Sequence, residues 1–235
     1  MIYIICINII ALISVAIYIQ KGEALKKKTL FLILVLTCVY SIACAAEGEE
    51  VWDIDSGYGS ILSSPTVSGG YVYVGSQYLG SSTPNNKLHC LNATTGDKVW
   101  DYPTGDGVTS SPAVSVGYVY VGSDDNKVYC LNAATGAYVW DYTTGGSVAS
   151  SPAVSGGYVY VGSDDNKVYC LNAATGDKVW EYATYETAGY FNSSPAVSGG
   201  RVYVGSGDIY CLKAADGDTG SWPMFQYNPE RTGAN

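Results

Sequence analysis

The stretch YVYVGSDDNKVYCLNAATG occurs at residues 118–136 and again, without one change, at residues 158–176. A repeat with a period of about 40 residues is typical of architectures in which each unit is one supersecondary structure. Such units bury their apolar faces against one another instead of forming separate domains. The repeat therefore decides the fold of this chain of 235 residues.

One repeat unit contains four short segments with the composition of β-strands. Residues 150–182 read SSPAVSGGYVYVGSDDNKVYCLNAATGDKVWEY. Valine and tyrosine favour strands, and the Gly, Asp, Asn and Thr residues between these segments favour tight turns. Four antiparallel strands in about 40 residues are the signature of a β-propeller blade. The sequence therefore predicts an all-β propeller.

The tripeptide Ser-Ser-Pro marks the start of each predicted blade. It places blades near residues 61–102, 111–142, 151–182 and 194–213, within a propeller domain that spans residues 47–235. The fourth blade lacks a Trp-containing last strand, but residues 50–54, EVWDI, look like such a strand. We expect strand 50–54 to complete the fourth blade and to close a four-bladed ring, which would remove open sheet edges. The alternative is that two chains form one eight-bladed ring, so both a monomer and a homodimer are considered.

Three segments carry a resemblance to a known family: LNATTGDKVW (91–100), LNAATGAYVW (131–140) and LNAATGDKVW (171–180). They resemble the tryptophan-docking repeat of pyrroloquinoline-quinone-like (PQQ-like) β-propellers, and WPMFQYNPERTG (222–233) is similar to a segment of secreted members. The resemblance implies a structural docking role for Trp52, Trp100, Trp140 and Trp180. The family's rings usually have seven or eight blades, and its members include enzymes, assembly factors and surface proteins. The resemblance therefore implies a fold but no particular activity.

The first 46 residues differ from the rest of the chain. Residues 1–20 are almost wholly apolar, and KGEALKKK precedes a second apolar run, TLFLILVLTCVYSIACAA. Lysines followed by an apolar run and small residues indicate a secretory signal peptide. The first run is long enough for a membrane helix, or it lies upstream of a true start at Leu25. We expect the remainder to be extracytoplasmic, either secreted or at the cell surface, with membrane association through the N-terminus as the alternative.

The charge of the mature part disfavours polyanionic partners. The chain has 12 basic and 21 acidic residues, of which four lysines and one glutamate lie in residues 1–46. The remainder therefore has a net charge of −12. Because phosphate backbones and anionic lipids attract basic surfaces, we expect no nucleic-acid partner.

No candidate metal, cofactor or catalytic site emerges from the sequence. Cys90, Cys130, Cys170 and Cys211 recur at one position of the repeat. In a propeller, equivalent third strands lie roughly 20 Å apart, too far for disulfides or a shared zinc ion. Calcium could bind the repeated Asp-Asp-Asn (124–126 and 164–166) or DGDTG (216–220), but hairpin-turn chemistry explains the first motif, and the second lacks the closing glutamate. His89 is interpreted as a strand residue rather than a base.

Identical blades are poor places for a catalytic site, because catalysis needs different groups that converge on one point. A site is expected instead where the repeat is broken, at residues 77–86 and 183–192, which should emerge on one face. The candidate binding residues there are Gln77, Tyr78, Tyr185, Tyr190 and Phe191.

We expect a non-catalytic binding scaffold with a protein or carbohydrate partner, and neither PQQ nor calcium as a cofactor. The alternatives are a factor like those of outer-membrane assembly, or a fragment of a PQQ-dependent enzyme. The resemblance would imply eight blades, an adjacent Cys pair and acidic calcium ligands for such an enzyme, but the sequence has no adjacent Cys pair and predicts only four blades. Asn92 and Asn192 lie in N-glycosylation sequons.

Overall fold

The structure is a computed structural model that describes residues 48–54, 59–78, 86–184, 191 and 193–215. The chain divides into two compact units, residues 1–53 and 54–235, and every strand lies in the second unit. The described residues contain no helix, which confirms the prediction of an all-β fold for this part. Within that part there is likewise no helix long and apolar enough to cross a membrane. The predicted signal segment at residues 1–46 lies outside the described residues.

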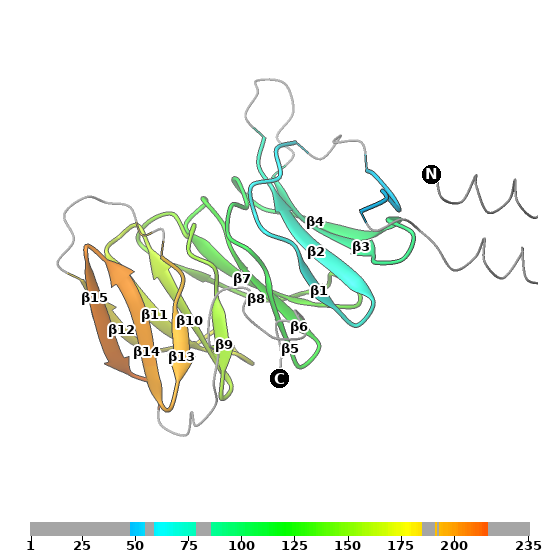
Figure 1. Cartoon of the computed structure of the whole chain (residues 1–235). Coiled ribbons are helices and arrows are strands. Elements are labelled where there is room, and N and C mark those ends of the chain that lie inside the picture. The colour runs from blue at the N-terminus through cyan, green and yellow to red at the C-terminus, as the bar shows by residue number, and fades with distance from the viewer. Residues whose placement is uncertain (1–47, 55–58, 79–85, 185–190, 192, 216–235) are drawn as a thin grey trace, which may run out of the picture. The chain divides into compact units, whose positions relative to one another are not determined.

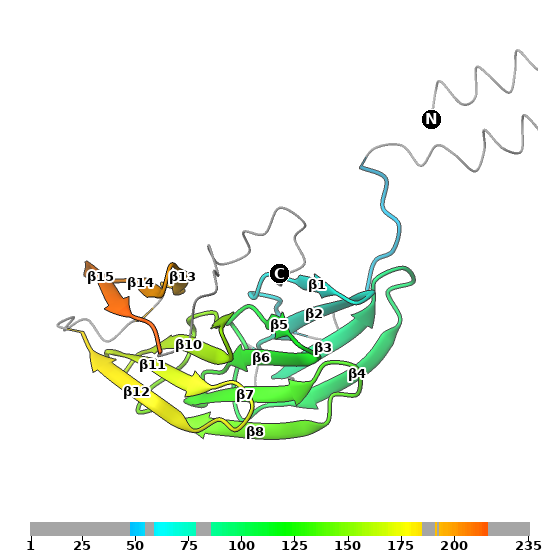
Figure 2. The ribbon, with the colours of Figure 1, turned by 90° about the horizontal axis from the view of Figure 1, so that it is seen from below.

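Four antiparallel sheets follow one another along the second unit (Figures 1 and 2). The first three sheets have four strands each and the last has three, with hydrogen-bonded neighbours in chain order. The strands are β1 (Thr66–Ser68), β2 (Tyr71–Ser76), β3 (Lys87–Asn92), β4 (Lys98–Pro103), β5 (Ala113–Ser115), β6 (Tyr118–Gly122), β7 (Lys127–Asn132), β8 (Tyr138–Thr143), β9 (Ala153–Ser155), β10 (Tyr158–Ser163), β11 (Lys167–Asn172), β12 (Lys178–Ala183), β13 (Ala196–Ser198), β14 (Arg201–Ser206) and β15 (Asp208–Lys213). These four-stranded antiparallel sheets are those of propeller blades.

The apolar cores lie between neighbouring sheets rather than within any one sheet. Between the first and second sheets, Tyr73 and Trp100 pack against Val119 and Leu131. The equivalent side chains fill the core between the second and third sheets. Because each internal sheet is covered on both faces, its strands can be apolar on both sides, as the Tyr-Val-Tyr-Val segments are.

One alanine carbonyl joins each of the first two sheets to the next. Both Tyr73 Oη and Trp100 Nε1 donate to the carbonyl oxygen of Ala133, at 3.1 and 3.0 Å. Gly136 (φ +70°) lies against the indole, where an added Cβ would come within 2.7 Å of Trp100. The next interface repeats this arrangement with Tyr120, Trp140, Ala173 and Gly176. The Ala-x-x-Gly spacing of the repeat thus places an acceptor and a close-packing glycine at one indole.

A second contact repeats along the second strands. A glycine in each of the first three sheets receives a side chain from the following sheet; we call this glycine the socket and the inserted side chain the knob. A Cβ added to the socket would lie 2.3, 2.5 and 2.0 Å from the nearest side-chain atom of the knob in the pairs Gly75–Val108, Gly122–Val148 and Gly162–Phe191. No larger residue fits at these sockets without displacing the neighbouring sheet.

A chain of serines links the innermost strands. The backbone N–H of Ser64 donates to Ser111 Oγ at 2.8 Å, that of Ser111 to Ser151 Oγ at 2.9 Å, and that of Ser151 to Ser194 Oγ at 3.1 Å. These residues belong to the recurring Ser-Ser-Pro, so the tripeptide that marks each unit also ties it to the next.

The predicted strand at residues 50–54 is wrong. These residues are not in a strand, and within the described residues β13–β15 has no fourth strand, so no closed ring is formed there. Charge gives a physical reason. In the first three sheets a lysine at the start of the third strand pairs with an acid that follows the tryptophan; these pairs are Lys87–Asp101, Lys127–Asp141 and Lys167–Glu181. In β15 the lysine position holds Asp208, and the acid of the expected strand is Asp53, so pairing would oppose two carboxylates.

Removing the indole of Trp140 should destabilise the second unit. Trp140→Ala deletes a side chain that is 5 % exposed and leaves one donor fewer at the Ala173 carbonyl. We expect the free energy of unfolding to fall by roughly 3–5 kcal/mol, measured by urea denaturation. Val139→Ala, at the exposed neighbouring position, should change it by less than about 1 kcal/mol. Similar losses for the two variants would contradict the docking role.

Val116 should be a strained residue whose replacement by glycine stabilises the fold. It takes φ +49° in the β5–β6 turn, where the equivalent turns have Gly69, Gly156 and Gly199, and its side chain is 91 % exposed. Because a β-branched residue is disfavoured at positive φ, Val116→Gly should raise the free energy of unfolding by about 1 kcal/mol. Val116→Ala keeps the φ penalty of a Cβ and should gain less. A loss of stability in the glycine variant would show that the turn is not strained.

Candidate functional site

The candidate site is the face formed by the β2–β3, β6–β7 and β10–β11 turns together with the links between sheets; we call it the loop face. Backbone hydrogen bonds hold the turns and links together. Asp124 N donates to Gly107 O at 2.8 Å, and Asp164 N donates to Ser147 O at 2.9 Å. The irregular connections 77–86 and 183–192 therefore both begin and end on this face, because β2 and β12 both end there. The sequence predicted the same from the order of the strands.

The second aspartate of each Asp-Asp-Asn turn has a structural role. Asp125 Oδ2 accepts hydrogen bonds from Gly105 N at 2.7 Å and from Tyr129 Oη at 2.6 Å, and Asn126 adopts φ +71°. Burial and this carboxylate raise the pKa of Tyr129 above its usual range. The next turn repeats these contacts with Asp165, Gly145, Tyr169 and Asn166. In both turns the second aspartate thus ties the turn to the preceding link between sheets and to a tyrosine of the next strand.

The first aspartate of the β6–β7 turn, Asp124, binds side chains of neighbouring turns and links. Asp124 Oδ1 accepts from Ser147 Oγ at 2.6 Å, and its Oδ2 accepts from Gln77 Nε2 at 3.4 Å. Burial raises the pKa of Asp124 above the ordinary carboxyl value, and the negative charges of Asp106 and Asp164 add to this, while the Ser147 hydrogen bond opposes it. We call Asp106, Asp124 and Asp164 the acidic trio.

No cation neutralises the acidic trio among the described residues. Asp106 Oδ1 accepts from Gly107 N at 2.8 Å, and Asp164 Oδ1 accepts from the backbone N–H of Phe191 at 2.5 Å. The ion pairs in the described part of the chain instead involve acids on the outer strands: Asp101, Asp141 and Glu181. The trio was not predicted from the sequence as a set, although Asp106 departs from the repeat, which has Gly146 at the equivalent place.

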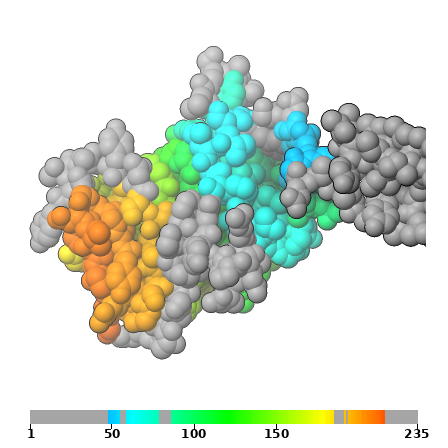
Figure 3. Space-filling model, in the orientation of Figure 1, coloured from blue at the N-terminus to red at the C-terminus, as the bar shows by residue number. Residues whose placement is uncertain are grey.

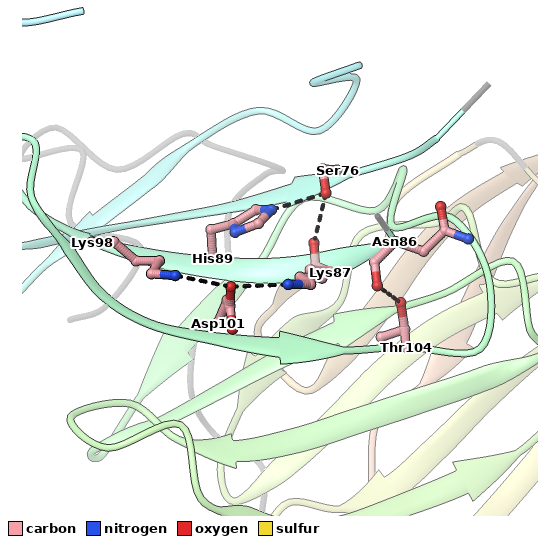
Figure 4. Close-up of polar contacts among 7 residues, drawn as sticks. All are labelled: Ser76, Asn86, Lys87, His89, Lys98, Asp101 and Thr104. Atoms are coloured by element: carbon pink, nitrogen blue, oxygen red, sulfur yellow. Dashed lines mark hydrogen bonds and ion pairs between the residues drawn. The ribbon is translucent and has the colours of Figure 1, made fainter. Parts of the chain in front are cut away.

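The first sheet departs from the repeat next to the loop face (Figure 4). His89 stands where Tyr129 stands in the second sheet, and its Nε2 lies 2.9 Å from Ser76 Oγ. Asn86 Oδ1 accepts from Tyr78 N at 2.8 Å, which fixes the two ends of the 77–86 connection. Residues 79–85 of that connection lie outside the described residues.

The Ser76–His89 contact has the atoms of a nucleophile and base but no opening for a substrate. The two residues are 0 and 1 % exposed. Asp101, the acid opposite His89 in the β3–β4 pair, binds Lys87 at 3.1 Å and Lys98 at 3.4 Å instead of the imidazole (Figure 4). Burial lowers the pKa of His89 to about 4, so the ring is neutral near pH 7. We interpret the pair as a core hydrogen bond.

One predicted binding residue is buried, and others lie outside the described residues. Phe191 is 1 % exposed because it is the knob in the Gly162 socket, equivalent to Val108 and Val148; its expected surface role is therefore wrong. Gln77 and Tyr78 are half-buried at the edge of the loop face. Tyr185, Tyr190 and the sequon residue Asn192 are not among the described residues. The other sequon residue, Asn92, accepts hydrogen bonds from Thr94 N and Thr95 N.

The four tryptophans named as docking residues have different environments. Trp100 and Trp140 are buried between sheets, whereas Trp180 is half-buried and Trp52 lies outside any strand. A pocket of about 480 Å³ beside Trp180 is lined by residues that include Tyr182, Leu212 and Ala214. In the first two interfaces the corresponding place holds the glycine of the docking turn. By sequence position the equivalent glycine is Gly217, which lies outside the described residues.

The thiols and acids offer no metal centre within the described part of the chain. None of Cys90, Cys130, Cys170 and Cys211 forms a disulfide within the described residues; the first three are buried and Cys211 is exposed. No three His, Cys, Asp or Glu side chains of the described residues are grouped so that they could hold a metal ion.

Comparison with known proteins identifies the family. The family model described as outer membrane protein assembly factor BamB matches residues 39–117 and 84–220. The chain belongs to this family of PQQ-like β-propeller repeat proteins. No curated protein sequence matches the chain.

Solved structures share the fold at low sequence identity. BamB from Moraxella catarrhalis is 21 % identical with a TM-score of 0.57, and the match covers 68 % of this chain and 52 % of BamB. The computationally designed protein Ika4 is 15 % identical with a TM-score of 0.60, covering 72 % of this chain and 99 % of Ika4. The quinohemoprotein alcohol dehydrogenase ADHIIG from Pseudomonas putida HK5 is 19 % identical with a TM-score of 0.52, covering 76 % of this chain and 35 % of the enzyme. The chain thus spans about half the length of BamB.

His89 should make the stability of the fold depend on pH between about 4 and 6.5. Its pKa is about 4 in the folded state and ~6.5 in an unfolded chain. Protonation therefore favours unfolding: the full stability is present above pH 6.5, and about 3 kcal/mol is lost as the pH falls toward 4. Asp124, with its raised pKa, contributes in the opposite direction and does not cause this loss. Urea denaturation at several pH values measures it.

The control is His89→Gln, which keeps an amide within reach of Ser76 but does not titrate. The chain has one histidine, so no other imidazole contributes. If the variant loses as much stability between pH 6.5 and 4 as the natural chain, the loss does not come from His89.

Proposed function

We propose that this chain is a non-catalytic, extracytoplasmic β-propeller scaffold that binds a protein partner through the loop face. The observation that carries the proposal is the acidic trio, a set of carboxylates with no cation beside it among the described residues. By contrast, the acids that follow the tryptophans on β4, β8 and β12 have lysine partners. A surface that lacks its own counter-charges favours a partner that supplies Lys or Arg side chains.

The family supports a protein partner over other classes. Its model is described as an assembly factor for an outer membrane protein, and BamB is among the structural neighbours. A role in holding a protein during assembly is the specific form of the proposal that this membership supports. The same membership and the predicted signal segment support an extracytoplasmic location. The acidic trio itself would repel nucleic acids.

A catalytic role has less support. The chain matches only 35 % of the length of the quinohemoprotein dehydrogenase. Residues that recur in every sheet point in directions rotated from one sheet to the next, so they do not converge on one reacting atom. The one contact with catalytic atoms, Ser76 with His89, is buried.

A carbohydrate partner also has less support than a protein. Sugar rings bind on exposed aromatic faces, but Phe191 is in the core. Tyr78 is half-buried, and its backbone N–H is bound to Asn86.

A peptide array probed with the purified chain tests this proposal. We expect peptides with two or more Lys or Arg residues to be retained, and the affinity to fall as salt rises. Asp124→Asn combined with Asp164→Asn keeps oxygen acceptors for Ser147 and for Phe191 N while removing two charges. This variant should bind the selected peptides about tenfold more weakly, measured by titration calorimetry.

The matched control is Asp97→Asn, which removes an exposed carboxylate in the β3–β4 turn, at the opposite end of the strands. It should leave the peptide affinity within about twofold, because a charge so far away is screened. Equal effects of the two changes would mean that net charge rather than the loop face binds the peptides. Retention of neutral glycans alone would reject a protein partner.

A further inference from the structure

The last sheet has a socket that the described residues leave open. Gly205 in β14 is equivalent to Gly75, Gly122 and Gly162. A Cβ added to Gly205 would meet, among the described residues, only Ser193 of its own sheet, at 3.3 and 3.6 Å. At the other three sockets the added atom would collide with the side chain of the knob at 2.5 Å or less.

The first sheet has a knob without a described socket. Ile61 precedes its Ser-Ser-Pro by two residues, as Val108, Val148 and Phe191 precede theirs. Those three side chains are 0, 0 and 1 % exposed, whereas Ile61 is 46 % exposed. The adjoining inner strand agrees, because Val67 is 43 % exposed while its equivalent in the third sheet, Val154, is 6 % exposed.

The outer face of the last sheet is apolar and exposed around the open socket. Ile209 is 87 % exposed and Tyr203 is 38 % exposed, whereas their equivalents in the third sheet, Val168 and Tyr160, are completely buried. In Figure 3 the β13–β15 sheet, in orange, forms part of the molecular surface. The last sheet therefore has an exposed socket face like the one that a preceding sheet offers to the sheet after it. The first sheet has an exposed knob like the one that a following sheet inserts.

We propose that two copies of this chain join head to tail, with Ile61 of each copy inserted as a knob into the Gly205 socket of the other. The two junctions are identical, so the pair is symmetric and closes into one ring of eight sheets. The serine series continues across each junction, with Ser194 N–H donating to Ser64 Oγ of the second copy. Ile209 and Tyr203 are then buried against the first sheet of that copy.

A second copy fits better than the chain's own first sheet. Three successive contacts of the same kind already join the four sheets, and they leave Ile61 exposed and the Gly205 socket open. The match to BamB covers 52 % of that protein, so the four sheets correspond to about half of a larger fold of this kind. Two such halves supply the missing length.

Native mass spectrometry of the purified full chain tests this proposal, and we expect the mass of two chains. Gly205→Leu fills the socket, and because Gly205 has no positive φ and has space beside it, the variant should fold as a single chain. Ile61→Asp removes the knob. Each variant alone should have the mass of one chain, with an unchanged far-ultraviolet circular dichroism spectrum. Val116→Asp, which places a charge on a turn residue that is 91 % exposed, should remain dimeric.

Mixing the two variants gives the deciding measurement. In an equimolar mixture, one junction would pair the filled socket of the Gly205→Leu chain with the charged knob position of the Ile61→Asp chain. That junction cannot form. The second junction combines natural Gly205 with natural Ile61. We therefore expect a mixed dimer of one Gly205→Leu chain and one Ile61→Asp chain.

Three results overturn the proposal: a natural chain that has the mass of one copy, a natural assembly of three or more copies, or a mixture of the two variants that stays monomeric. None of these results depends on peptide binding, so they leave the loop-face proposal to its own test.

Discussion

The carbonyl oxygen of Ala133 and its equivalent in Ala173 are the points on which the structure depends. Each accepts hydrogen bonds from a tyrosine hydroxyl and an indole N–H of the preceding sheet, while a glycine three residues later lies under the indole. A buried carbonyl without donors is costly, and so is a buried indole N–H without an acceptor. The contact therefore satisfies three polar groups and fixes the distance between two sheets at the same time.

This constraint explains why nineteen residues recur without change. An internal sheet must offer donors to the sheet that follows and an acceptor to the sheet that precedes it. In the second sheet Tyr120, Cys130 and Trp140 face the third sheet, while Val119, Leu131 and Ala133 face the first. Close packing on both sides leaves few volumes that fit. Only the end sheets, with one described neighbour each, have room for changes such as His89 in the first sheet or Asp208 in the last.

The sequence predicted the repeat, the strands and the docking tryptophans because these depend on local patterns of one unit. It did not predict that residues 50–54 lie outside any strand, because strand propensity does not show whether a strand finds a partner to pair with. That depends on one distant position, where Asp208 replaces the lysine of the other sheets. Phe191 was assigned to a binding loop because aromatic residues in irregular segments suggest surfaces. A signal for its true role was present: an apolar residue stands two positions before the serine pair in every unit.

The acidic trio combines residues of two kinds. Asp124 and Asp164 belong to the repeated turn and would occur in any number of identical sheets, whereas Asp106 and the neighbouring Gln77 each replace a different repeat residue. The negative charges of Asp106 and Asp164 help to raise the pKa of Asp124 above the ordinary carboxyl value. Within the described residues the combination arises once, because the link between the second and third sheets has Gly146 where the preceding link has Asp106. A partner that reads all three charges is therefore expected to bind once per chain, even though the scaffold is built from repeated parts.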